Sequence, residues 1–443
     1  MIHRIIFFIF CFIYSESRDA SLTVYKDGTA LIKQPVRWTV TIGKNIIDWD
    51  QLPTGIQRDT PFLNLDGATI MSQRFNDKVF SSADYFAGLK GQKILLKPIS
   101  GKMINGILME INQNHVSIEY RNSIYTYNRK ELEYMSGQNK VINPIFKPYL
   151  SWDIQSSMAT NLNGELVYKS KNFSWSTVYR IKMTDEFHGE LIAEAVIDNS
   201  SDLDFTNVDL QLVEGNLNKL YSQRLMKKRA VVSQSRMAPE KMMEQEELGD
   251  YHIYPLKNSH NLQAKESITV RMYGPLNVKY KKTYVFENSE RRQKEEPLEV
   301  QLNLENTESN GLGISLPGGK VEMYSYLNST GLEYIGADKM GQVPKGQSTI
   351  LTSGRAFDVV GNRKVLNYDR QRKSEEAVIE IKVTNARSEK VDVLLIEHIN
   401  GDWIIKDESL NYQKKNASTI HFPLSVQSGE TKSVYYTYRK EWK

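Results

Sequence analysis

The sequence predicts an all-β protein made of antiparallel β-sandwich domains, and three observations support that fold class. Residues 171–215 read as a three-stranded meander, in which apolar and polar residues alternate from Phe173 to Met183 and polar turns separate the later segments. Residues 298–443 contain about seven further short segments of this kind, a spacing typical of a sandwich. The chain also has 24 tyrosines against 15 phenylalanines, and strands favour aromatic and β-branched residues.

The length of 443 residues predicts more than one domain, because a single hydrophobic core seldom exceeds about 250–300 residues. The hydrophobic fraction of 40% and the charged fraction of 25% are ordinary for a soluble globular protein. We therefore expect an N-terminal β region, a small β-barrel, a central β-sandwich and a C-terminal β-sandwich, in that order, at residues 18–85, 86–137, 145–286 and 297–443.

Residues 1–17 have the pattern of a signal peptide. Arg4 supplies the positive charge, an apolar run of ten residues follows from Ile5 to Tyr14, and small residues precede a cleavage position after Ser17. Ten helical residues reach only about 15 Å, half of a hydrocarbon core, so the run is too short to span a membrane. A buried first strand is the alternative interpretation. The pattern favours a secreted or periplasmic protein.

Cysteine and charge limit the chemistry that is open to the chain. The only cysteine, Cys11, lies inside the apolar run, and Phe10 before it is not the small residue that lipid modification requires. Cleavage would leave no cysteine, which excludes disulfides, thiol catalysis and cysteine-bound zinc, and which fits a bacterial periplasm or cell surface. The net charge of +4 is too small to indicate a nucleic-acid partner. No later apolar run reaches membrane length, so we expect no transmembrane segment after signal removal.

The N-terminal β region begins with two strands that flank Asp27-Gly28, a favoured hairpin turn pair. Residues 90–135 then form a unit of five short strands separated by polar turns, with Gly106 inside the second. A glycine within a strand marks the sharp bend that small barrels need. This segment resembles the small five-stranded Sm-like barrels, an SH3-like fold. Its loops at 112–114 and 128–130 lack the aspartate and glycine of RNA-binding members, so the resemblance implies the fold and not RNA binding.

Two polar segments interrupt the strands of the central and C-terminal regions. Residues 233–249 are rich in Met, Glu and Lys and lack β-branched residues. We expect a mobile loop with a short helix after Pro239, and a methionine-rich contact surface is the alternative. Residues 287–297 are charged, which indicates a surface turn or a linker between domains. Leu316-Pro317-Gly318-Gly319 reads as a turn before a strand, because it lacks the lysine and helix start of a phosphate-binding loop.

Several separated motifs carry a family resemblance that covers nearly all of the chain after the leader. They are VYKDGTALIKQ, WSTVYRIKM, VIDNSSDLDFTNVDLQLVEGN, LPGGKVEMY, GRAFDVVGNRK and IEHINGDWII. With these motifs the chain resembles bacterial exported proteins that carry the domain of unknown function numbered 4139, a group that overlaps the mucoidy-inhibitor A-like proteins. The resemblance implies an exported β protein and implies no activity. Many relatives have a coiled coil in the N-terminal half, where this chain has the Sm-like unit.

Candidate chemical groups are few, and each favours a structural interpretation. His252 and His260 lack a metal-ligand spacing. Glu397 and His398 are adjacent in a predicted strand, so their side chains point to opposite faces and cannot share a site directly. Arg355 and Asp358 indicate a salt bridge or a loop clamp. We therefore predict no catalytic, metal-binding or cofactor-binding residue and no cofactor.

The sequence as a whole predicts an exported, non-catalytic cell-envelope protein that binds or scaffolds a protein or glycan partner. The alternative is an envelope hydrolase that acts on polysaccharide or peptide through an unrecognised carboxylate site. Nucleic-acid binding through the Sm-like unit is the third and least favoured interpretation.

Overall fold

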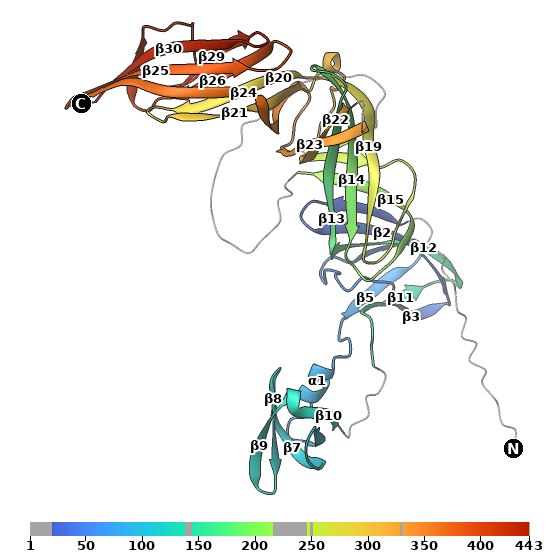
Figure 1. Ribbon diagram of the computed structural model, residues 1–443. Coiled ribbons are helices and arrows are strands. Elements are labelled where there is room, and N and C mark those ends of the chain that lie inside the picture. Colours follow the sequence, from blue (N-terminus) through green and yellow to red (C-terminus); the bar gives the residue numbers. More distant parts are fainter. Residues whose placement is uncertain (1–19, 138–143, 216–245, 249–250, 328–330, 443) are drawn as a thin grey trace, which may run out of the picture.

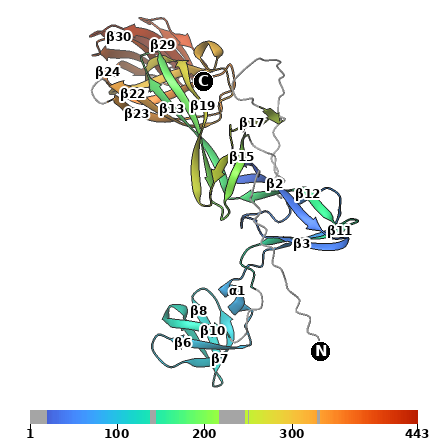
Figure 2. The same cartoon turned by 90° about the vertical axis from the view of Figure 1, so that its right-hand side faces the viewer.

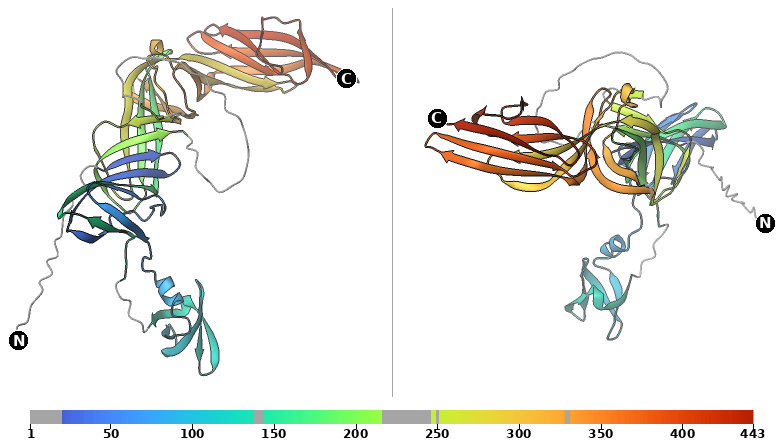
Figure 3. Two further views of the ribbon diagram at one scale, coloured as in Figure 1. Left: turned by 180° about the vertical axis from the view of Figure 1, so that it is seen from behind. Right: turned by 45° about the horizontal axis from the view of Figure 1, so that its top comes forward.

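The computed structural model describes residues 20–137, 144–215, 246–248, 251–327 and 331–442. The chain is nearly all β, with 67% of residues in strands and 3% in helix, so the predicted fold class is confirmed. Three hydrophobic cores organise the described residues. Figure 1 shows two sandwiches joined through long strands and a small barrel set apart from both. The views in Figures 2 and 3 show the same separation of the barrel.

The first sandwich packs three sheets around one core. The largest sheet contains β1 (Ser21–Tyr25), β2 (Thr29–Val40), β4 (Phe62–Leu65), β12 (Thr160–Lys171), β15 (Phe205–Glu214), β16 (Glu246–Leu248), β17 (Tyr251–Pro255) and β18 (His260–Leu262). The second contains, in spatial order, β19 (Glu266–Lys279), β14 (His188–Asn199), β13 (Phe173–Met183), β22 (Gly319–Leu327) and β23 (Gly331–Met340). The third contains β3 (Gly43–Trp49), β11 (Tyr149–Ser156) and β5 (Thr69–Asn76).

The second sandwich is one nine-stranded sheet that folds around its own core. Its strands, in spatial order, are β27 (Asp402–Lys406), β30 (Thr431–Glu441), β25 (Ser374–Asn385), β24 (Ser348–Arg370), β21 (Lys294–Glu305), β20 (Lys281–Ser289), β26 (Val391–His398), β29 (Thr419–Val426) and β28 (Gln413–Lys414). A single 3-10 turn, η2 (Glu308–Asn310), follows β21.

The small barrel has five strands in the spatial order β10-β6-β7-β8-β9. It consists of α1 (Ser82–Ala87), β6 (Lys93–Pro98), β7 (Ile104–Ile111), β8 (His115–Tyr120), β9 (Ser123–Asn128), the 3-10 turn η1 (Arg129–Glu131) and β10 (Leu132–Gly137). Gly106 is buried in β7, and a Cβ there would lie 2.8 Å from the Glu119 carbonyl oxygen and 2.9 Å from Ile118 Cδ1. A side chain at position 106 would therefore press on β8, which accounts for the glycine there, and the register of β7 with β8 shifts nearby, between Leu108 and Glu110.

The helix α1, which opens the barrel, was not predicted from the sequence. Ser81 caps α1 by accepting a hydrogen bond from the backbone N–H of Asp84, and Leu89 just after the helix lies in the barrel core. The expected boundary between residues 85 and 86 is therefore wrong, because it divides this helix.

The expected end of the barrel at residue 137 agrees with the end of β10 at Gly137. Two further boundaries are wrong, because segments that are distant in sequence share one core. The first core contains residues of the expected N-terminal region 18–85, such as Leu22, together with residues of the expected central sandwich, such as Tyr179. These two expected regions therefore share one core. The second core begins at Tyr284, before the expected start at residue 297. The charged segment 287–297 is the hairpin between β20 and β21, which confirms a surface turn and contradicts a linker between domains.

Pairing among the described strands is mainly antiparallel, but some pairs are not. Three strand pairs are parallel, namely β1 with β15, β13 with β22, and β20 with β26. Each joins segments far apart in sequence, which the alternation of residues within one strand does not reveal.

The two sandwiches repeat one arrangement of strands. In the first, the β1–β2 hairpin lies beside β15 with β1 parallel to it, and in the second the β20–β21 hairpin lies beside β26 in the same way. Asn199 ends β14 and Asn385 ends β25, and both are fully buried. Each donates its side-chain amide to three main-chain carbonyls, those of Leu203, Leu262 and Gln263 for the first and of Glu389, Val426 and Gln427 for the second.

Two further predicted segments have different outcomes. Gly319 begins β22, and Pro317 and Gly318 accept hydrogen bonds from Tyr179 and Lys26, so the predicted turn before a strand is confirmed. Most of the predicted mobile loop 233–249 lies outside the described residues. The described part of it, Glu246–Leu248, pairs with β17 as a strand, so for these three residues the prediction of a loop is wrong.

Candidate functional site

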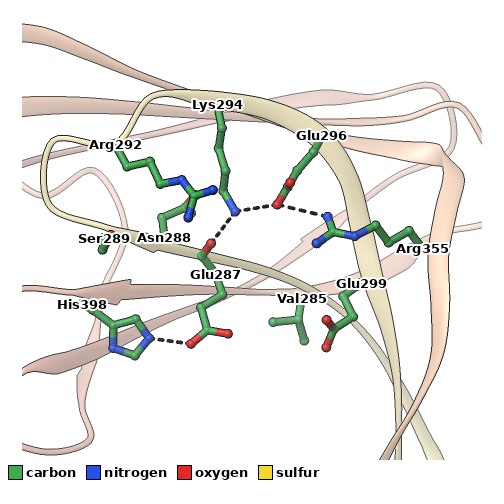
Figure 4. Close-up of a pocket in the computed structure, with 10 residues that line it drawn as sticks. All are labelled: Val285, Glu287, Asn288, Ser289, Arg292, Lys294, Glu296, Glu299, Arg355 and His398. Carbon is green, nitrogen blue, oxygen red and sulfur yellow. Dashed lines mark hydrogen bonds and ion pairs between the residues drawn. The ribbon is translucent and has the colours of Figure 1, made fainter. Parts of the chain in front are cut away.

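A polar pocket of about 350 Å³ lies on the second sandwich, where β20, β21, β24 and β26 meet (Figure 4). Ten residues line it, of which seven are charged residues or histidine, and Val285 is the only apolar one. The β20–β21 hairpin supplies most of the wall, and Ser289 of β20 lies opposite His398 of β26 in the parallel register. Because the groups come from paired strands, the main-chain ladder fixes their positions.

Three charged side chains on one side of the pocket form a linked group. Glu296 pairs with Lys294 at 2.5 Å and with Arg355 at 3.1 Å. Lys294 also donates to the main-chain carbonyl of Glu287 at 2.6 Å. Arg355 likewise donates to the carbonyl of Pro297 at 3.0 Å. The hydrogen bond from Lys294, supported by the bond from Arg355, holds the pKa of Glu296 below its ordinary value.

A histidine and a carboxylate form a second linked group in the pocket. His398 Nε2 lies 2.6 Å from a carboxylate oxygen of Glu287, and Nδ1 of the same ring lies 3.1 Å from Thr419 Oγ1. Both ring nitrogens therefore have protein partners. The Thr419 residue is only 7% exposed and does not line the pocket.

A buried charged network holds the hairpin that forms the pocket wall. Arg363 and Glu397 pair at 2.7 Å with both side chains fully buried, and Tyr436 donates to the same carboxylate at 2.5 Å. Arg363 also donates to the main-chain carbonyls of Glu290 and Arg292 in the turn between β20 and β21. Burial, reinforced by the charge of Glu397, raises the pKa of Tyr436 well above 10.0. The network thus ties the turn to the core of the sandwich.

Three residues of the pocket, Arg292, Glu299 and Asn288, each keep a polar group without an ionic or hydrogen-bonding partner among the described residues. Arg292 is exposed, and its guanidinium makes no hydrogen bond, ion pair or ring contact with another described residue. Glu299 accepts hydrogen bonds from Gln301 and Thr352 but has no cation beside it in the described chain. Asn288 is 3% exposed, and its Oδ1 atom has no donor among the described residues. These are the groups that a ligand could satisfy.

The first sandwich also has a buried carboxylate, Glu214 at the end of β15, as the second has Glu397 near the end of β26. Glu214 is 6% exposed and pairs at 2.5 Å with Lys26, which lies just after β1 and 4.6 Å above the ring centre of Trp175. Lys26 also donates to the Gly318 carbonyl at 2.6 Å. Each of these four residues, Lys26, Trp175, Glu214 and Gly318, belongs to a different motif of the family resemblance. Four of those motifs therefore meet at one place in the fold.

The structure brings together two of the residues that the sequence singled out. His398 and Arg355 line the same pocket, whereas Asp358, His252 and His260 do not. The salt bridge predicted for Arg355 is present, but its partner is Glu296 on the neighbouring strand and not Asp358.

The prediction that adjacent strand residues point to opposite faces is also confirmed. Glu397 faces the core and is fully buried, and His398 faces the pocket. Glu287, Lys294 and Glu296 were not predicted to line a pocket, although all three lie in the charged segment 287–297. Charge density was the available signal, and it indicated only a surface position.

Among the described residues, no group of three or more metal-ligating side chains is close enough to hold a metal ion. No helix in the described ranges combines the length and apolar character needed to cross a membrane. Neither the protein-family models nor the curated proteins with which the chain was compared gave a match.

Proposed function

We propose that this chain is an exported, non-catalytic protein of the cell envelope, which binds or scaffolds a protein or glycan partner through the pocket on its second sandwich. The observation that carries the proposal is the pocket itself, a preformed polar hollow whose walls are paired strands. The signal-peptide pattern of residues 1–17 and the resemblance to the exported proteins with domain 4139 support the location.

The pairing of the charged groups supports recognition. Lys294, Glu296 and Arg355 engage one another, and the main chain fixes both cations. Groups that are held in this way present hydrogen bonds in fixed directions, which favours specific binding of a polar partner.

One observation favours the alternative of an envelope hydrolase. The pair of His398 and Glu287 at 2.6 Å resembles a base with its orienting carboxylate, and Ser289 lies beside it. An activated serine, however, would need the second nitrogen of the ring. That nitrogen lies against Thr419, a residue that is 7% exposed and outside the pocket lining. The geometry therefore supports binding better than hydrolysis.

The decisive experiment is cross-linking and pull-down of the tagged full chain from the native cell envelope. We expect a defined partner with the wild-type chain and a loss of that partner with Arg292→Glu. The matched control is Arg291→Glu, since Arg291 is the next residue of the same turn but donates to Tyr368 at 3.0 Å and does not line the pocket. Equal recovery with both variants would exclude the pocket as the binding site.

A turnover assay tests the alternative directly. The purified chain is incubated with envelope polysaccharide and with envelope peptides, and release of products is measured. Hydrolysis that disappears in Glu287→Gln would replace the proposed binding function with that of a hydrolase.

A further inference from the structure

The charges that line the pocket balance one another. Three cations, Arg292, Lys294 and Arg355, stand against three carboxylates, Glu287, Glu296 and Glu299, so the lining is neutral when His398 is uncharged. In the view of Figure 4 the three cations and Glu296 occupy one side, and the carboxylates of Glu287 and Glu299 lie on the other. A ligand of one charge sign would therefore meet repulsion on one wall.

Only one cation and one carboxylate of this set lack a charged or histidine partner. Arg292 has no side-chain partner in the described chain, and Glu299 has no cation beside it there. The other charged groups are engaged, because Glu296 joins Lys294 to Arg355 and Glu287 pairs with His398. The complementary ligand thus carries one negative and one positive group.

We infer that the pocket binds a small zwitterion, an α-amino acid or a short peptide with a free ammonium group and a free carboxylate. Arg292 holds the carboxylate and Glu299 holds the ammonium group. The inference rests on the proposed binding function and names the ligand class for that same site.

A buried amide gives independent support for a ligand with N–H donors. Asn288 lines the pocket at 3% exposure, and its Nδ2 donates to the Phe286 carbonyl at 3.3 Å, while Oδ1 has no donor within the described ranges. An acceptor left unpaired in a buried position is costly, and the ammonium or amide N–H of a peptide would satisfy it.

Size and surface chemistry narrow the class further. A volume of about 350 Å³ is near the lower end of ligand pockets, which span about 300–1,000 Å³, and it suits an amino acid or a dipeptide. Val285 is the only apolar residue in the lining, so no aromatic face is present on which a sugar ring could rest. The pocket therefore favours a charged peptide over a neutral saccharide.

Calorimetric titration of the purified full chain tests this inference. The probes are L-alanyl-L-alanine, its N-acetyl derivative, its C-terminal amide and neutral maltose. We expect the free dipeptide to bind and each blocked form to bind at least about tenfold more weakly, the size expected when one charge-assisted hydrogen bond is lost. Arg292→Gln should remove the preference for the free carboxylate only, and Glu299→Gln the preference for the free ammonium group only.

Two variants at neighbouring charged residues serve as controls for the titration. Arg291→Gln and Glu295→Gln change neighbouring charges that do not line the pocket, and both should bind the dipeptide as the wild-type chain does. Equal affinity for free and blocked dipeptides, binding of maltose alone, or no binding of any probe would overturn the zwitterion inference. A partner captured from the envelope in an Arg292-dependent manner would still support the binding function in those cases, so the two failures can be distinguished.

Discussion

Arg363 of β24 and Glu397 of β26 form an ion pair at 2.7 Å with both side chains fully buried. The two residues come from strands that do not pair with each other, and Arg363 also holds the turn between β20 and β21 through the carbonyls of Glu290 and Arg292. The pair therefore joins three parts of the second sandwich. Its energetic role follows from the cost of leaving one buried charge alone.

We predict that Arg363→Met lowers the free energy of unfolding of the second sandwich by about 3–5 kcal/mol, because Glu397 would remain buried without its cation. The double variant Arg363→Met with Glu397→Leu should recover most of this loss. Urea-dependent hydrogen exchange of peptides from β25 and β26 measures the change. Arg439→Met is the control, since its pair with Glu441 is exposed and should cost under about 1 kcal/mol. A loss under about 1 kcal/mol for Arg363→Met would contradict the prediction.

The buried asparagines Asn199 and Asn385 should each stabilise only their own sandwich. Replacement by alanine leaves three main-chain carbonyls without their donor, which we expect to cost about 2–4 kcal/mol. Hydrogen exchange should show faster opening of β14 and β19 in Asn199→Ala, and of β25 and β30 in Asn385→Ala. The exposed turn residue Asn416, which accepts from Ser418, is a control with little expected effect. Equal loosening of both sandwiches by either variant would argue against separate roles.

Gly106→Ala should destabilise the small barrel by about 1–3 kcal/mol, because the new methyl group would press on the Glu119 carbonyl and the Ile118 side chain. The measurement is thermal unfolding of the full chain together with hydrogen exchange of β7 and β8. Gly341→Ala is the matched control, since no atom lies within 4 Å of its added Cβ. If the two variants have the same effect on barrel exchange, close packing at Gly106 is not the reason for the glycine.

The linked group around Glu296 should give the second sandwich a dependence on acid pH. Lys294 first and then Arg355 hold the pKa of the Glu296 carboxyl below its ordinary 4.5 in the folded chain. A depressed folded pKa means that the carboxylate contributes its full stabilisation above pH 4.5 and loses it as the pH falls through the folded pKa. The stability difference between the wild-type chain and Glu296→Gln should therefore be constant near neutral pH and shrink below pH 4.5.

Denaturant titrations at several pH values would measure this difference. Glu296 and Arg355 remain partly open to solvent, with 28% and 52% of their side chains exposed. The effect should therefore be small and should weaken in 1 M salt, where the Debye length is about 3 Å. A difference that grows toward lower pH would have the opposite sign and would rule out the ion pairs as its cause.

Local features of the fold could be predicted from the sequence because they depend on neighbouring residues. Alternation located the three strands of residues 171–215, and the Asp27-Gly28 turn located the first hairpin. The expected three-stranded meander is wrong, because β13 pairs with β14 but β15 lies in the other sheet beside β1. The helix α1 was missed, although Ser81 and Asp84 have the spacing of a helix cap, because six helical residues give too short a periodic signal.

The site could not be predicted because it depends on contacts between distant segments. Ser289 and His398 lie opposite each other in a parallel pair, and no pattern within β20 or β26 indicates this register. Alternation from Leu298 to Leu304 correctly indicated a strand but did not reveal that Leu298 belongs to one core and Leu302 to the other. Charge alone therefore placed the pocket residues at the surface without showing that they converge.

The passage of β21 and β24 through both cores has a mechanical consequence. These strands are hydrogen-bonded to each other, and β24 extends from Leu351 in the first core to Val359 in the second. Between the two cores their pairing is irregular, because Pro297 pairs with Val360 and Glu299 with Arg355, which leaves residues 356–359 without a partner on β21. A bulge of this kind bends a strand, so the junction is where the two sandwiches would first bend relative to each other. A force applied to the second sandwich would reach the first through these two strands and would act on the irregular pairing between the cores.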